Sequence, residues 1–134
     1  MFKITNIEEI NGKYGRDIGT ELIVGVSNIV KRSISSQYIF VRYMGPKFAI
    51  AFSGVDMQGV EGFVETTKEE IENFKIEIEG KKVNSKKKKQ EYVSAKTNFA
   101  LATYYKGTGL EEVTKKLEEY LDECELDESN INCI

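Results

Sequence analysis

The stretch Arg42-Tyr43-Met44-Gly45-Pro46-Lys47-Phe48 decides how this chain folds, because it joins two short runs of apolar residues. Residues 38–41 precede it and residues 49–52 follow it, and both runs are rich in β-branched and aromatic side chains. Such runs are typical of buried strands. The connection contains Gly45 and the only proline of the chain, Pro46, whose fixed φ suits the second position of a tight turn. The stretch therefore predicts a β-hairpin with this connection at its tip.

Ahead of the hairpin and just after it, helical and extended patterns alternate. Residues 2–4 predict a short opening strand, and a brief helical turn is expected to end at Gly15, because glycine suits a left-handed cap. Asp17 is expected to cap a helix that runs to about Ile34, and Asp56 to cap a helix beyond the hairpin. This part of the chain thus predicts the order strand, helical turn, helix, hairpin, helix.

The second half predicts more strands and a last helix. Residues 74–78 alternate apolar and charged side chains, as a half-exposed strand does, and another strand is expected within residues 92–104. The last helix, residues 110–124, is expected to bury a stripe formed by Leu110, Val113, Leu117, Leu121 and Cys124. Helices separated by strands, with one hairpin in the middle, predict an α/β fold, an α+β sandwich around a mixed sheet.

The composition limits the classes of function. A chain of 134 residues is expected to form one domain with a single core, and its net charge of −3 argues against nucleic-acid binding, which needs a basic surface. No window has the length and hydropathy of a membrane span, and Cys124 and Cys133 cannot form a disulfide framework, so a cytoplasmic location is expected. The absence of histidine excludes Ser-His-Asp catalysis and imidazole metal sites.

The hairpin stretch resembles the R-Y-G-G-D-E-F hairpin of GGDEF domains, the diguanylate cyclases that make cyclic di-GMP from two GTP molecules. The residues that match are Arg42, Tyr43, Gly45 and Phe48. Pro46-Lys47 stands where the family has its acidic pair. The resemblance implies that the GGDEF fold is kept, with its central antiparallel hairpin and flanking helices, while the cyclase chemistry is lost.

A second match lies upstream, where residues 3–23 follow the family's opening D-x-D-x-F-K-x-I-N-D-x-Y-G-H-x-x-G-D-x-L-L without a gap. The residues in register are Ile10, Asn11, Tyr14, Gly15, Gly19 and Leu22. Residues 97–102 look like the family's V-S-I-G-I-A strand. The resemblance implies a degenerate GGDEF domain over residues 1–125 and a loose acidic and polar tail over residues 126–134. The family's upstream D-x-L-T-G-L-x-N-R segment is missing, which indicates a fragment of a longer protein.

The resemblance also implies where an active site once stood. Cyclases of this type need two divalent metals, held by carboxylates on the first strand and at the hairpin. The positions of this vestigial active site are Lys3, Thr5, Asn11, Thr20, Met44, Gly45, Pro46 and Lys47. An ammonium group repels a metal ion instead of binding it, so no metal, no cofactor and no catalytic residue are expected.

The positions that hold nucleotide in the family are also changed. Of the asparagine and aspartate that contact guanine, Asn11 keeps the first and Thr20 replaces the second. The phosphate-binding lysine and arginine of the family's Y-x-A-K-x-x-G-R-N ending align with Glu125 and Ser129. The R-x-x-D site for inhibitory cyclic di-GMP aligns with residues 35–38, which contain neither residue. Asn11 alone is then left as a nucleotide contact, and an asparagine before glycine also suits a plain turn.

Two charged features have more than one interpretation. Lys3 and Lys47 should lie near each other in this fold, and they either hold a phosphate without metal or pair with surface carboxylates such as Glu8 or Glu9. The lysine-rich residues 81–89 are either an anionic docking patch or a solvated loop.

Taken together, the residues and the resemblance predict a catalytically inactive regulatory or interaction domain of a bacterial signalling protein. Its expected partners are other domains of a longer protein, a separate protein or a second copy, with no nucleic acid and no membrane span. The alternatives are a sensor that binds GTP, ATP or cyclic di-GMP, and a weak nucleotide hydrolase with a rearranged site.

Overall fold

The computed structural model describes residues 1–78, 91–105, 107, 109–124 and 129–134. The lysine-rich residues 81–89 and the phosphate-binding position Glu125 were singled out from the sequence, and both lie outside the described residues.

The centre of the fold is a five-stranded mixed sheet with the strand order β2-β3-β1-β6-β7. Its strands are β1 (Phe2–Ile4), β2 (Ile39–Arg42), β3 (Lys47–Ala51), β6 (Thr97–Leu101) and β7 (Ile131–Cys133). The pair β6–β7 is parallel and the other neighbours are antiparallel. Strands β4 (Lys75–Ile78) and β5 (Glu91–Ser94) form a separate antiparallel pair that projects from one end. The mixed sheet with the hairpin β2–β3 confirms the predicted fold class.

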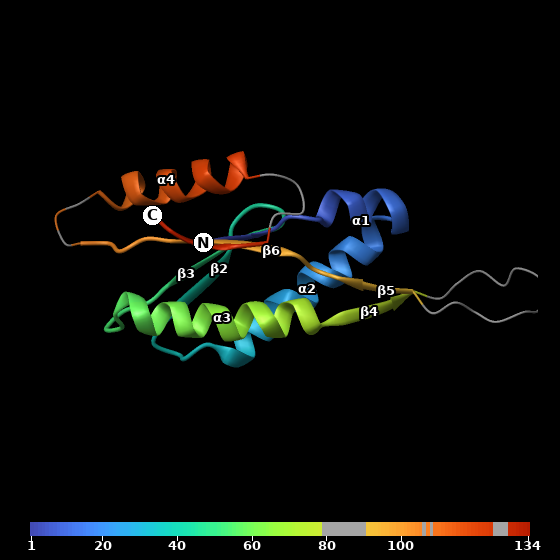
Figure 1. Ribbon diagram of the computed structural model, residues 1–134, viewed down its shortest axis with the longest axis horizontal. Coiled ribbons are helices and arrows are strands. Elements are labelled where there is room, and N and C mark those ends of the chain that lie inside the picture. Colours follow the sequence, from blue (N-terminus) through green and yellow to red (C-terminus); the bar gives the residue numbers. More distant parts are fainter. Residues whose placement is uncertain (79–90, 106, 108, 125–128) are drawn as a thin grey trace, which may run out of the picture.

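Helices cover both faces of this sheet, as Figure 1 shows. They are α1 (Ile7–Tyr14), α2 (Arg16–Ser33), α3 (Met57–Asn73) and α4 (Leu110–Glu123). Helices α2 and α3 pack on one face, and α4 lies on the opposite face, against β6. The sheet is therefore the middle layer of a sandwich.

Aromatic side chains build the core on the α2–α3 face. Because side chains alternate along a strand, even-numbered residues of β1, β2 and β3 point to this face. Phe40, Phe48, Phe2 and Phe99 form a continuous row across four strands, with successive ring centroids 5.8, 4.8 and 4.6 Å apart. This row belongs to the same buried cluster as the apolar face of α2.

Two of the predicted helix caps have different outcomes. Asp56 caps α3 as predicted, because its Oδ1 accepts a hydrogen bond of 2.9 Å from the backbone N–H of Gly59. The prediction that Asp17 caps α2 is wrong, since that helix already begins at Arg16 and its N-cap is Gly15. Gly15 has a φ of +95°, which lets the chain end α1 and begin α2 at the same residue. Asp17 instead lies in the first turn, where its charge suits the helix dipole.

Two predictions of burial are wrong in part. Strand β2 is an edge strand, and Ile39 is 65% exposed on it. In the last helix only Leu121 of the predicted stripe is fully buried, and Leu110 is 62% exposed. The apolar spacing marked the correct face of α4, but the face packs on the sheet mainly near its C-terminal end.

The C-terminal residues add an element that the sequence did not reveal. The expectation of a loose tail is wrong for Ile131–Cys133, which form β7 beside β6. Backbone hydrogen bonds of 2.8 Å join Phe99 N to Asn130 O and Ile134 N to Leu101 O. Residues 92–104 likewise hold parts of two strands, β5 and β6, where the sequence predicted one. Within the described ranges, no helix combines the length and apolar character that crossing a bilayer requires.

Candidate functional site

The tip of the hairpin is a tight turn whose backbone is anchored to β1. The N–H of Lys47 donates to Met44 O at 3.0 Å, which makes Gly45 the second and Pro46 the third residue of the turn. Pro46 was expected at the second position, but Gly45 has a φ of +55°, a conformation that hairpin turns favour there and that proline cannot adopt. Ile4 N donates to Pro46 O at 3.0 Å, so the turn is held directly beside the first strand.

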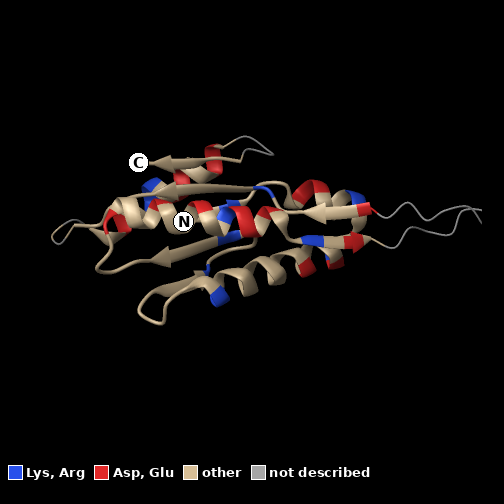
Figure 2. Ribbon diagram, turned by 60° about the horizontal axis from the view of Figure 1, so that its bottom comes forward, with Lys and Arg blue, Asp and Glu red and all other residues tan. Residues whose placement is uncertain are grey.

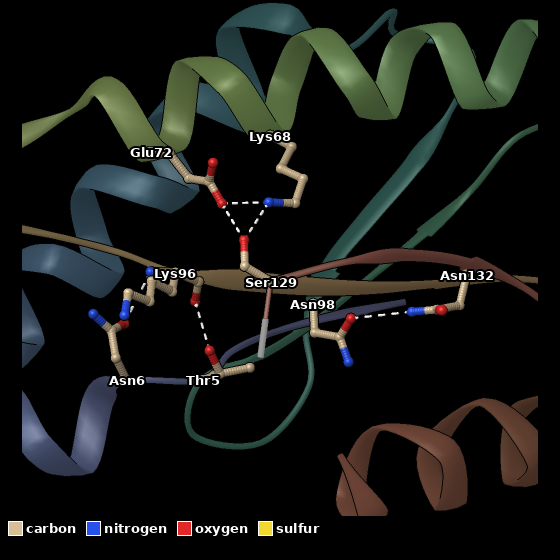
Figure 3. A network of polar contacts seen from close by, with 8 residues as sticks. All are labelled: Thr5, Asn6, Lys68, Glu72, Lys96, Asn98, Ser129 and Asn132. Atoms are coloured by element: carbon tan, nitrogen blue, oxygen red, sulfur yellow. Dashed lines mark hydrogen bonds and ion pairs between the residues drawn. The ribbon is translucent and has the colours of Figure 1, made fainter. Parts of the chain in front are cut away.

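A row of polar side chains crosses the sheet on the α4 face, behind the aromatic row. The register pairs Lys3 with Lys47 on one side and with Asn98 on the other. The prediction that the two lysines lie side by side is therefore confirmed. Asn98 is completely buried, and its Oδ1 accepts a hydrogen bond of 3.2 Å from Asn132 Nδ2 (Figure 3). The positions where the family places metal-binding carboxylates thus carry two ammonium groups next to a buried amide.

Side chains of the hairpin and of α4 interact at two places. Lys47 forms an ion pair with Asp122, a residue of α4 rather than Glu8 or Glu9 of α1. One helical turn earlier, Glu118 raises the pKa of the exposed Tyr43 phenol, chiefly through hydrogen bonding and also through its negative charge. Glu118 and Asp122 are four residues apart and so lie on the same side of the helix. Lys3, in contrast, makes no ion pair with any residue that the structure describes.

The phosphate-binding position at Ser129 is occupied by a different network. Ser129 Oγ donates to Glu72 Oε1 at 2.6 Å and accepts from Lys68 Nζ at 2.5 Å, and Lys68 and Glu72 are themselves an ion pair on α3 (Figure 3). Both of these hydrogen bonds of Ser129 are therefore made with residues of α3. Its hydroxyl fastens the segment before β7 to the helix layer, on a different element from the α4 contacts of Lys47.

Thr5, the second of the family's first-strand acidic positions, has a structural role here. Its N–H and its hydroxyl both donate to Lys96 O, at 2.8 and 3.3 Å. The neighbouring Asn6 donates from Nδ2 to Ser94 O at 2.9 Å. Its Oδ1 accepts from Lys96 N at 2.9 Å (Figure 3). These contacts join the end of β1 to the junction between β5 and β6.

The guanine-contact positions Asn11 and Thr20 lie at the corner between α1 and α2. The Oδ1 atom of Asn11 is buried without a hydrogen-bond partner and lies so close to Gly19 that a Cβ there would stand 1.8 Å away. Thr20 is exposed on α2. Asn11 thus packs against the neighbouring helix, and the structure brings neither residue into the row formed by Lys3, Lys47 and Asn98.

Several residues of this region were not picked out from the sequence. Asn98 carried a usable signal, because a polar residue inside an otherwise apolar strand is uncommon. The spacing of Glu118 and Asp122 marks one side of a helix, but it does not reveal that the hairpin lies beneath them.

Among the described residues, no group of three or more Asp, Glu, Cys or His side chains is arranged to hold a metal ion. Figure 2 shows basic and acidic residues interspersed over the helices and strands.

Comparison with known proteins supports the assignment of this fold to the GGDEF family. The family model described as "Diguanylate cyclase, GGDEF domain" matches residues 1–130. No curated protein sequence matches the chain. Thirteen solved chains resemble the fold significantly.

Three of these structures illustrate the likeness. The diguanylate cyclase SiaD of Pseudomonas aeruginosa, solved with its activator SiaC, has a TM-score of 0.78 at 12% identity, over 99% of this chain and 47% of SiaD. The GGDEF domain of DgcB from Caulobacter crescentus, solved with c-di-GMP, has a TM-score of 0.73 at 16% identity, over 98% of this chain and 72% of that chain. The active GGEEF domain of a diguanylate cyclase from Vibrio cholerae has a TM-score of 0.69 at 15% identity, over 98% and 77%.

At these identities the solved structures establish the fold alone, and the chain spans about half of the SiaD chain that it matches. The family model is the stronger finding, because it covers nearly the whole chain, including the β1 and hairpin positions described above. This chain belongs to the GGDEF family of diguanylate cyclase domains.

Proposed function

We propose that this chain is a catalytically inactive GGDEF domain that regulates or scaffolds a larger signalling protein. The observation that carries the proposal is the cross-strand pair of Lys3 and Lys47, two residues that align with the family's metal-binding carboxylates. Metal-assisted transfer needs hard oxygen ligands that neutralise a triphosphate and activate a ribose hydroxyl. Two ammonium groups repel such ions, and the carboxylate of Asp122, which among the described residues pairs with Lys47, is occupied by that ion pair.

The changed phosphate positions add independent support. Glu125 and Ser129 align with the family's phosphate-binding lysine and arginine, and Ser129 is already hydrogen-bonded to Lys68 and Glu72. A carboxylate where a cation once bound phosphate replaces attraction by repulsion. For this reason the proposal does not depend on the metal positions alone.

The test is a direct assay of cyclic di-GMP synthesis. The purified chain is incubated with GTP and either magnesium or manganese, and the product is separated by chromatography, with the active Vibrio cholerae GGEEF domain as the positive control. We expect no cyclic di-GMP above a blank without enzyme. Appreciable product from the unmodified chain would overturn the proposal. Release of GDP or inorganic phosphate in the same incubation would instead favour the hydrolase alternative.

The regulatory role is inferred from the loss of chemistry together with the retained fold. We infer that the chain acts in the cytoplasm through other domains of a longer protein, through a bound protein or through a second copy of itself. SiaD, a protein of this fold, has been solved with its activator. The product of the complete gene, isolated with its bound partners, is the most direct test of this part of the proposal.

A further inference from the structure

The cross-strand lysine pair carries more positive charge than its described surroundings neutralise. Lys3 and Lys47 are direct Cα partners in antiparallel strands, so their side chains leave the same face of the sheet. Like charges at directly opposite positions repel each other. Asp122 provides one carboxylate for the pair, and it is bound to Lys47. Lys3 has no counterion among the residues that the structure describes.

The two members of the ion pair differ in their access to water. The side chain of Lys47 is 17% exposed, whereas that of Asp122 is 55% exposed. An ammonium group that is largely withdrawn from water needs an anion beside it, because an uncompensated charge there costs free energy. A mostly exposed carboxylate can return to water at little cost. Asp122 is thus the member that can be replaced, provided that another anion takes its place beside Lys47.

The second contact between the hairpin and α4 leaves the charge of the pair unchanged. Tyr43 is neutral and interacts with Glu118, so it does not compete with an anion for the ammonium groups. An anion arriving at Lys47 would therefore break the ionic contact with Asp122. It would leave the interaction of Tyr43 with Glu118 at these two positions.

We propose that Lys3 and Lys47 form a metal-free binding site for a phosphate-bearing anion, and that Asp122 is a tethered competitor which occupies the site in the free protein. Binding displaces the Asp122 carboxylate and loosens the hairpin from α4, so that ligand binding is converted into movement of an exposed turn. The inference deepens the proposed function by giving the regulatory domain a ligand class and a moving part. Lysine is a suitable group, because its ammonium binds phosphate oxygens as a compact point charge.

The experiment measures anion binding by calorimetry in a low-salt buffer freed of divalent ions by a chelating resin. Inorganic pyrophosphate and GTP are the two probes, and they distinguish a site for the phosphate chain alone from one that also uses the nucleoside. We expect weak binding to the unmodified chain and binding about tenfold tighter, or more, to Asp122→Asn, falling as salt rises. The matched control is Glu119→Gln, which removes a carboxylate from the same helix at an exposed pair with Lys115 and should leave the affinity unchanged.

Two lysine variants complete the test. Lys3→Gln and Lys47→Gln, each combined with Asp122→Asn, should abolish the gain in affinity, whereas Lys115→Gln in the same background should preserve it. In NMR spectra, the methyl resonance of the exposed Met44 should shift on binding. Thermal unfolding of every variant checks that it is folded.

The proposal is overturned if folded Asp122→Asn binds neither probe at millimolar concentration, or binds no more tightly than the unmodified chain. That result would leave the absence of cyclase activity untouched, because activity is measured separately with metal present. Conversely, cyclic di-GMP synthesis by the unmodified chain would refute the proposed function, whatever the anion measurements give.

Discussion

Phe2 and Phe48 stack with ring centroids 4.8 Å apart, on the opposite face of the same two strands that carry Lys3 and Lys47. Each lysine is the chain neighbour of one of these rings, because successive side chains of a strand point to opposite faces. The rings are buried in the core, so they fix the backbone from which the lysines project. The altered site therefore lies on the opposite face of the same strands from a buried aromatic stack, and its chemistry can be changed without touching that core.

Removal of Phe48, one of the two inner rings of the aromatic row, should show how much of the stability the row provides. Phe48→Ala leaves a cavity between two stacked rings, and we expect the free energy of unfolding to fall by about 3–5 kcal/mol. Ile39→Ala is the control on the neighbouring strand, where the exposed side chain should contribute less than about 1 kcal/mol. Urea unfolding followed by circular dichroism gives both values. Equal losses for the two variants would contradict the role assigned to the aromatic row.

Restoring acidic residues at the metal positions should not restore synthesis of cyclic di-GMP. We expect the triple variant Lys3→Asp, Pro46→Glu, Lys47→Glu to remain inactive with GTP and manganese. Its new carboxylate at position 47 would face Asp122, and the positions for phosphate binding would still be Glu125 and Ser129. Chromatography of the reaction measures the product, and circular dichroism checks the fold. Recovery of activity would mean that the metal ligands alone had been missing.

Asn6→Ala should destabilise the corner between β1 and the β5–β6 junction. The change removes the amide that donates to Ser94 O and accepts from Lys96 N, so two backbone groups lose their partner. We expect a loss of about 1–3 kcal/mol in the free energy of unfolding. Asn28→Ala, at an exposed position of α2, provides a control of the same chemistry that should cost almost nothing. A negligible effect of the Asn6 substitution would show that water satisfies both groups.

The amino group of Met1 should make stability depend on pH in a chain that begins with a free amine at this residue. Burial lowers the pKa of this group from 8.0 to about 6, while it donates a 3.0 Å hydrogen bond to Ala100 O. Between these two values the unfolded chain binds more protons than the folded one. Stability should therefore rise with pH from 6 to 8, by up to about 3 kcal/mol, and then level off.

The measurement for Met1 is urea unfolding at pH 6, 7 and 8. The sequence contains no histidine, so no side chain ordinarily has its pKa between pH 6 and 8. The same chain with an acetylated amine should lose the dependence, because an amide keeps the N–H donor but does not titrate. An identical slope in both chains would rule out the amine as its source.

The sequence predicted the elements whose signals are local. The cap at Asp56, the helix that follows it and the opening strand Phe2–Ile4 are all as expected, since they depend on nearby residues alone. The proximity of Lys3 and Lys47 followed from the family resemblance, and it is confirmed by their direct pairing across β1 and β3.

The features that could not be predicted depend on contacts between distant parts of the chain. Asp122 meets Lys47 because α4 crosses the sheet face beside the hairpin, and no local pattern encodes that crossing. Strand β7 is short and exists through its pairing with β6, so its isolated sequence reads as a loose segment. The apolar run of β2 marked a strand correctly, but it did not reveal that one face of that strand is open to water.

The two ends of the chain are bound to neighbouring residues of a single strand, since Met1 N donates to Ala100 O and Ile134 N donates to Leu101 O. Strand β1 runs antiparallel to β6 and β7 runs parallel to it, so both chain ends lie at the C-terminal end of β6, on opposite sides of that strand. Tension applied between chains attached at these ends would load the backbone hydrogen bonds one after another. The flanking strands would then peel away as a zipper opens, at lower force than if they had to slide past β6.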